Sequence, residues 1–188
     1  MKIKFSDYML GAGVATDLVN TSPVVRTVRG EALTDPPALD RFLAEHGIAA
    51  EAADGDVERV RALRRDVREI LEAGTEDEVA DAASALVLRA GRGPVLRRDD
   101  DGDWQWCVAT APDASLADRL AVLMGTGLLG ALRTLGHGRF RPCASPECEG
   151  RFVDTSRAGR RRYCMPEVCG NRLNVANHRA RRATSPRR

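Results

Sequence analysis

The chain has 188 residues, a net charge of +2, and a composition that is 43% hydrophobic but only 4% aromatic. This length suits one medium-sized domain with a small appended unit. Because aromatic residues are scarce, the larger core must consist mainly of Leu, Val and Ala, which favours helices over a β-sandwich or a β-barrel. The N-terminal apolar run is too short for a signal peptide, and no stretch of about 18 apolar residues is present to span a bilayer. We therefore expect a cytoplasmic protein without a membrane partner.

Charge is distributed unevenly along the chain. Residues 1–136 carry 16 Lys and Arg against 23 Asp and Glu, which gives −7, whereas residues 137–188 carry 13 against 4, which gives +9. A polyanion such as DNA would therefore meet a favourable charge only in the C-terminal quarter.

Four segments in the first half of the chain show the apolar spacing of amphipathic helices. Polar capping residues or prolines mark most of their starts, and glycines mark most of their ends. Thr34 or Asp35 is the expected cap of the second helix, and Thr75 that of the fourth. We expect the four helices over residues 12–20, 36–47, 56–74 and 75–90.

A β-hairpin and a long helix are predicted next. Between Pro94 and Ala109, two short apolar runs flank the sequence RRDDDGD, whose Asp-Gly pair marks a turn. We interpret this acidic turn as a solvated loop, with a calcium site as the alternative. An unbroken apolar stripe from Leu116 to Leu135 predicts the helix, which Gly136 ends. Its small residues indicate close packing against other helices: Gly125, Gly127 and Gly130.

Four of the five cysteines form two Cys-x4-Cys pairs that are separated by fifteen residues. In a protein without an export signal such pairs favour a metal site over disulfides. Four thiolates make the closed tetrahedral shell of a structural zinc site, whereas a catalytic zinc keeps an open position. We predict one Zn²⁺ bound by Cys143, Cys148, Cys164 and Cys169, with four buried thiols as the alternative. Cys107, in an apolar run, is interpreted as buried.

The segment between the two pairs predicts the local fold of this zinc unit. Phe152 and Val153 indicate a strand, Ser156–Gly159 a turn, and the residues up to Tyr163 a returning strand, followed by a helix near Pro166. A turn, a β-hairpin and a helix around zinc resemble a treble clef. We expect a mainly α domain with a small β-hairpin over 1–136, a treble-clef-like zinc finger over 137–182, and a basic disordered tail over 183–188.

The helix expected after Cys169 has one polar face. Asn and Arg side chains on a rigid base can contact base edges and phosphates in a major groove, although a merely solvated face is the simpler interpretation. This face contains Asn171, Asn174, His178, Arg181 and Arg182. We expect phosphate contacts from the neighbouring Arg160, Arg161 and Arg162.

The string Cys169-Gly170-Asn171-Arg172, preceded by CASPEC and RFVDTSRAGRRRYC, resembles the CGNR zinc-finger family over residues 137–182. In that family four cysteines hold zinc, and each of their positions is matched here. The preceding region resembles the ABATE domain that usually accompanies this finger, through ATDLVNT at 15–21 and the helices that follow. The family is described as regulators of stress-induced transcription, so the resemblance implies DNA binding.

Three polar residues stand at the end of the first predicted helix: Asp17, Asn20 and Thr21. In one interpretation Asn20 and Thr21 satisfy backbone groups at the helix end while Asp17 pairs with Arg26 or Arg29. In the other, the three residues line a pocket for a small-molecule effector.

The leading function hypothesis is a DNA-binding regulator whose N-terminal domain senses an effector or a partner. The alternative is a zinc-stabilised module that binds protein or RNA. We expect no enzyme, because no Ser/His/Asp set, phosphate-binding loop or paired His ligands are present. A single short finger covers few base pairs, so useful specificity favours a homodimer.

Overall fold

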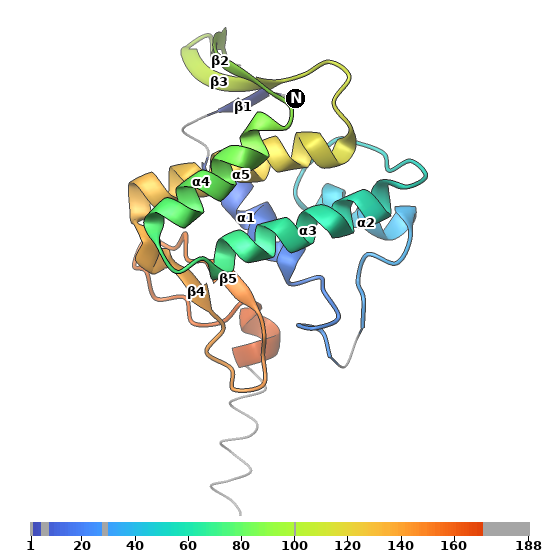
Figure 1. The fold of residues 1–188 in the computed structure, drawn as a ribbon, viewed down its shortest axis with the longest axis vertical. Coiled ribbons are helices and arrows are strands. Elements are labelled where there is room, and N and C mark those ends of the chain that lie inside the picture. Colours follow the sequence, from blue (N-terminus) through green and yellow to red (C-terminus); the bar gives the residue numbers. More distant parts are fainter. Residues whose placement is uncertain (1, 5–7, 28–29, 100, 171–188) are drawn as a thin grey trace, which may run out of the picture.

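The computed structural model describes residues 2–4, 8–27, 30–99 and 101–170. Five α-helices in this part of the chain form the body of the molecule, and a sheet and a small C-terminal unit lie at opposite ends of it (Figure 1). The helices are α1 (Tyr8–Val19), α2 (Pro36–Glu45), α3 (Asp56–Glu72), α4 (Glu76–Leu88) and α5 (Leu116–Leu135). All five helices predicted from apolar spacing are present, and α1 begins four residues earlier than expected.

Side-chain caps fix where three of these helices begin. The Asp35 carboxylate accepts a hydrogen bond from the Ala38 amide at 2.8 Å, at the start of α2. Thr75 and Glu78 form a reciprocal capping box at the start of α4. Ser115 accepts from the Asp118 amide at 3.1 Å and so starts α5. Each cap satisfies an amide that has no partner within its helix, which is why polar residues marked these starts in the sequence.

Helix α5 lies at the centre of the core because its glycines let neighbouring helices approach closely. A Cβ atom on Gly127 would lie 2.5 Å from the Gly11 Cα atom of α1. A Cβ atom on Gly125 would lie 2.7 Å from the Ala83 carbonyl oxygen of α4. The close packing expected from these small residues is therefore confirmed on two sides of α5.

The predicted hairpin is one part of a three-stranded antiparallel sheet. Strands β2 (Gly91–Arg98) and β3 (Trp104–Thr110) pair as expected, and β1 (Lys2–Lys4) adds to the other side of β3, giving the order β1-β3-β2. Cys107 on β3 is buried, as expected. The sequence analysis did not find β1, since three residues are too short to show an alternating pattern.

The C-terminal unit contains a second, two-stranded sheet and two single helical turns. The turn η1 (His137–Arg139) follows α5 directly and leads into β4 (Phe140–Pro142). Strand β5 (Arg151–Val153) pairs antiparallel with β4, and the turn η2 (Pro166–Gly170) comes last. The predicted fold class, a helix-rich region with a hairpin followed by a cysteine-containing finger, is confirmed.

The hairpin within the finger was assigned wrongly from the sequence. Val153 was expected to pair with a strand returning after Gly159, but it pairs with Phe140, and residues 154–165 form no strand. The first cysteine pair therefore lies inside the loop of the β4–β5 hairpin. The segment after β5 turns because the Asp154 carboxylate accepts from the amides of Ser156 and Arg161, which replaces a strand ladder with side-chain contacts.

The finger packs directly on the helices. The Val153 side chain belongs to the main hydrophobic core, and its amide donates to the Thr16 hydroxyl of α1 at 3.0 Å. The Asn20 amide group donates to the Arg151 carbonyl oxygen at 2.7 Å. Arg68 of α3 donates to the Glu149 carbonyl oxygen at 3.0 Å. The N-terminal helices thus position the hairpin that carries the first two cysteines. Among the described residues, no helix is both long and apolar enough to cross a membrane.

Candidate metal centre and finger surface

Four cysteine sulfurs converge at the tip of the finger. The Cys148 and Cys164 Sγ atoms are 3.5 Å apart, and each lies 3.7 Å from the Cys169 Sγ atom. With Cys143 included, all four sulfurs lie within 4.8 Å of one another. Four sulfurs about 2.3 Å from one metal ion form a tetrahedron with edges of about 3.8 Å. The geometry therefore fits a single tetrahedral metal ion.

Backbone groups around the cluster direct the sulfurs inward. The Cys164 amide donates to the Cys143 sulfur at 3.5 Å, and the Gly150 amide donates to the Cys148 sulfur at 3.4 Å. A Cβ atom on Gly150 would lie 2.3 Å from the Cys164 sulfur, so only glycine fits at this position. The sequence analysis missed Gly150, because its role depends on a contact between residues fourteen positions apart.

Burial governs the ionisation of these thiols. It raises the pKa of Cys148 from 9.0 to about 11. Burial and the neighbouring thiols raise the pKa of Cys164 further. Burial also acts on Cys143, but the amides of Cys164 and Ser145 outweigh it, so the pKa of Cys143 is lowered. A metal ion binds thiolates and must displace these protons, so metal affinity is expected to fall as the pH falls.

The cluster replaces a hydrophobic core in this unit. Among the described residues, three of its cysteines pack with two buried apolar residues, Val25 and Phe152, and with the partly buried Tyr163 and Met165. So few apolar side chains cannot hold a unit of this size by burial alone. Four thiolates that fill the coordination shell leave no open position for a substrate, so the arrangement suits a structural rather than a catalytic metal.

Comparisons with known proteins agree with this geometry. Residues 139–182 match the family model described as the CGNR zinc finger. Residues 12–135 match the ABATE model, described as "Putative stress-induced transcription regulator", and this match covers more than half of the chain. The chain belongs to the ABATE family. The architecture expected from the resemblance, an ABATE domain followed by a CGNR finger, is confirmed, and no curated protein matches the chain.

The arginines of the CGNR finger fall into two groups. The inner group surrounds Asp154, which is fully buried and accepts from Arg141 at 3.1 Å, while Arg139 lies 3.8 Å from the same carboxylate. Hydrogen bonds from Ser156, from the Arg161 amide and from Arg141 outweigh the effect of burial and lower the pKa of Asp154. Asp154 is therefore an ionised anchor for the loop that follows β5, and the sequence analysis did not identify it.

The outer group is exposed on that loop. Arg157, Arg160 and Arg162 are exposed and form no ion pair with any described residue. Arg161 differs: its guanidinium group lies 4.9 Å from the centre of the Phe152 ring and donates to the carbonyl oxygens of Tyr163 and Cys164. Of the three predicted phosphate contacts, Arg160 and Arg162 are exposed, although the Arg162 guanidinium lies 5.8 Å from the centre of the Tyr163 ring, and Arg161 braces the finger. Arg157 was missed, although it stands in the same basic run.

The three polar residues at the end of α1 make specific contacts. Besides Arg151, Asn20 donates to the Thr16 carbonyl oxygen at 2.7 Å. The Thr21 hydroxyl donates to the Leu18 carbonyl oxygen and accepts from Arg64 at 2.9 Å. Asp17 lies 3.6 Å from His46 and not beside Arg26, while the other expected partner, Arg29, lies outside the described residues. Burial raises the pKa of Asp17. Their predicted role in an effector pocket stays a prediction.

The predicted base-reading face lies outside the described residues, which end at Gly170. This applies to Asn171, Asn174, His178, Arg181 and Arg182, and to the tail at 183–188.

Proposed function

We propose that this protein is a DNA-binding transcription regulator. In this proposal the zinc-loaded CGNR finger contacts DNA and the ABATE domain senses an effector or a partner. The observation that carries the proposal is a group of exposed arginines that form no ion pair with a described residue: Arg157, Arg160 and Arg162. Arginines that face solvent without an acidic partner are available to phosphates.

Two further features support this function. The loop that presents the arginines is held by the buried Asp154 carboxylate and by the cysteine cluster, so it is already ordered before it meets a ligand. The segment 137–188 carries a net charge of +9, whereas residues 1–136 carry −7. A partner with a dense negative charge is therefore attracted to the finger and repelled by the ABATE domain.

Zinc is the metal that the donor set favours. Four soft thiolates in a tetrahedral arrangement suit Zn²⁺, which would be held by Cys143, Cys148, Cys164 and Cys169. The ion would supply folding energy to the finger and no catalytic step.

A salt titration tests the phosphate contacts. The affinity of the full zinc-loaded chain for a mixed-sequence DNA duplex is measured by fluorescence anisotropy over a range of salt concentrations. The double variant Arg160→Ala, Arg162→Ala should make the slope of log affinity against log salt less steep by about 1.8, since each phosphate contact contributes about 0.9. The matched control is Arg97→Ala, which removes an exposed arginine of β2 and should leave the slope unchanged.

Selection of bound sequences from a random DNA library tests the base contacts. Asn174→Ala should change the selected sequences, whereas Arg160→Ala should weaken binding to all sequences alike. DNA affinity that does not depend on salt contradicts the proposal. Tight binding to RNA or to a protein, with no DNA binding, supports the alternative of a zinc-stabilised module for those partners.

The proposal further includes a homodimer without enzymatic activity. One finger covers few base pairs, so two copies on one site would double the contacts available for specificity. Sedimentation of the protein with and without its selected DNA tests this, and a 1:1 complex on every selected site contradicts it.

A further inference from the structure

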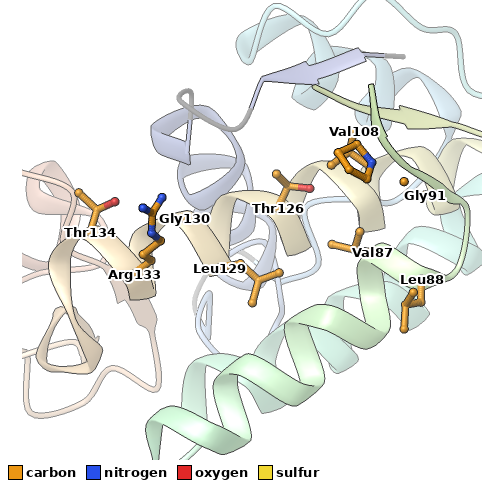
Figure 2. Close-up of a pocket in the computed structure, with 11 residues that line it drawn as sticks. Val87, Leu88, Gly91, Val108, Thr126, Leu129, Gly130, Arg133 and Thr134 are labelled. Atoms are coloured by element: carbon orange, nitrogen blue, oxygen red, sulfur yellow. The ribbon is translucent and has the colours of Figure 1, made fainter. Parts of the chain in front are cut away.

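An apolar pocket lies between α4, α5 and the sheet (Figure 2). Its volume is about 420 Å³, which is within the range of small-molecule sites. Its walls are largely aliphatic and come from all three elements: Val87 and Leu88 of α4, Leu129 of α5, and Pro94 and Val108 of the strands.

On its α5 side, the pocket follows one face of the helix. Thr126, Leu129, Gly130, Arg133 and Thr134 line it, and their spacing of three, four, seven and eight residues defines a single helical face. On the sheet side, the register between β2 and β3 shifts between Gly91 and Pro94, and both of these residues line the pocket. Such an irregularity bends the strand locally.

Two polar groups in this pocket have no protein partner. Thr126 is only 4% exposed, and its hydroxyl has no hydrogen-bond partner among the described residues. Arg133 is exposed and forms no ion pair within the same part of the chain. Seven residues separate them on α5, which corresponds to about 10 Å along the helix axis. A buried hydroxyl without a partner is costly, so a ligand that supplies the partner gains affinity.

We propose that this pocket binds a small amphipathic carboxylate. The carboxylate pairs with Arg133 at the open end, the apolar body lies along Leu129 and Val108, and a polar atom near the far end meets the Thr126 hydroxyl. In this assignment the pocket is the effector site of the proposed regulator. It therefore rests on the proposal that the ABATE domain senses an effector. The site is separate from Asp17, Asn20 and Thr21.

The position of the pocket connects it to the finger. Arg133 lies three residues before Gly136, where α5 ends and the chain enters η1. On another side, α5 contacts α1 through Gly127 and Gly11. Thr16 of α1 and Asn20, which directly follows α1, hold β5. A ligand that shifts α5 would therefore move the loop proposed to contact DNA in two ways: through η1, which follows α5 directly, and through α1, which holds β5.

Calorimetry with three probes of equal chain length tests the proposal on the full zinc-loaded protein. The probes are 8-hydroxyoctanoate, octanoate and 1-octanol. We expect affinity to decrease in that order. Octanoate lacks a polar atom for Thr126, and 1-octanol, whose single hydroxyl can meet Thr126, lacks the carboxylate for Arg133, which makes the stronger, charge-assisted contact. Equal affinity for all three, or no heat and no rise in melting temperature with any of them at millimolar concentration, overturns it.

Two variants assign the contacts. Arg133→Gln should weaken octanoate binding roughly fivefold to tenfold and leave 1-octanol unchanged, since only the charged hydrogen bond is lost. Thr126→Val, which keeps the side-chain shape, should remove the advantage of 8-hydroxyoctanoate over octanoate. Arg97→Gln, outside the pocket, should change neither. If both pocket variants bind the probes as the parent does, the site is elsewhere and the proposal fails.

These measurements need no DNA, so their failure is distinguishable from failure of the finger to bind DNA. A final titration of the DNA complex with 8-hydroxyoctanoate tests whether ligand binding in the pocket changes DNA binding by the finger. A change in DNA affinity that Thr126→Val abolishes supports effector sensing through this pocket. An unchanged affinity alongside confirmed probe binding overturns the regulatory part of the assignment.

Discussion

Glu31 and Arg64 form a bidentate ion pair that fastens the loop after α1 to α3. The Arg64 guanidinium donates to both Glu31 oxygens, at 2.7 and 2.6 Å. Burial opposes ionisation of Glu31, but the contacts with Arg64, the Leu33 amide and the Arg61 charge outweigh it. The pKa of Glu31 is therefore lowered from 4.5. Because the folded pKa is the lower one, this stabilisation is complete above the unfolded value and is lost as the pH falls through the folded value.

Glu31→Gln should therefore lower the free energy of unfolding at pH 7, by about 1–2 kcal/mol. The difference from the parent protein should shrink as the pH falls below 4.5, the ordinary value for this carboxyl. Urea denaturation of both proteins at several pH values measures this. A difference that is constant from pH 7 to pH 3 would show that the ion pair does not carry the effect.

Asn20 offers a test of the two interpretations of the α1 terminus. Its amide group bridges the Thr16 and Arg151 carbonyl oxygens, so Asn20→Ala leaves two acceptors without this donor and should cost about 1–3 kcal/mol. Thermal melting measures the loss. An unchanged melting temperature, together with a lost effector response, would favour the pocket interpretation at this position.

At the residue scale, the spacing of the cysteines along the chain was sufficient to predict which four would lie together. It was not sufficient for Gly150 or Asp154. Gly150 is required because the Cys164 sulfur lies beside it, and Asp154 matters because arginines from β4 and the following loop meet there. Both roles arise from contacts that form only after the hairpin has folded.

Among the elements, the long helices, the β2–β3 hairpin and the strand at β5 could be predicted, whereas β1 and β4 could not. Helices α2, α4 and α5 combine an apolar stripe with a side-chain cap at the start, so two local signals agree, whereas α3 has the stripe without a side-chain cap. Strand β4 has three residues, one of them Pro142, and its partner follows a loop of eight residues. The glycine turn at Ser156–Gly159 gave a stronger local signal than this pairing, but Asp154 controls that segment through side-chain contacts.

Two glycine substitutions test the close approach of α1 and α5. A Cβ atom on Gly127 meets backbone atoms of Gly11 and Ala12 at 2.5 Å, so Gly127→Ala must push the helices apart. We expect a destabilisation of roughly 1–3 kcal/mol. Gly13→Ala is the matched control on α1, where nothing lies within 4 Å of the added atom. This change should stabilise by about 0.5–1 kcal/mol, since alanine favours a helix. Effects of the same sign in urea denaturation would contradict this packing.

At the scale of the whole molecule, the change from net negative to net positive charge falls at the boundary between the helical body and the finger. The acidic ABATE helices support the basic CGNR finger through α1 and α3, and the three-stranded sheet lies at the opposite end of the helical body (Figure 1). The sequence indicated two units from charge and cysteine spacing. It did not indicate that Val153 of the finger completes the helical core, because that contact joins residues from opposite ends of the chain.

Because Val153 of the finger belongs to the helical core, metal removal should affect the finger and the helices differently. Cys164→Ser removes one of the four ligands, so the protein should lose its single zinc ion and the finger over 137–182 should unfold. The helices should keep most of their circular dichroism signal, because their caps and the packing of α5 do not involve the cluster. Their melting temperature should nevertheless fall, since Val153, Thr16 and Asn20 lose their partners across the interface.

Metal analysis and thermal melting of Cys164→Ser and Cys107→Ser separate these effects. Cys107 is buried in β3 and lies outside the cluster, so Cys107→Ser should lower stability while one zinc ion per chain is retained. Treating the parent protein with a chelator should reproduce the Cys164→Ser result and leave the helical signal largely intact. Loss of the whole helical signal on chelation would mean that the ABATE helices fold only together with the finger. In that case the two regions would form one cooperative unit despite matching two separate family models.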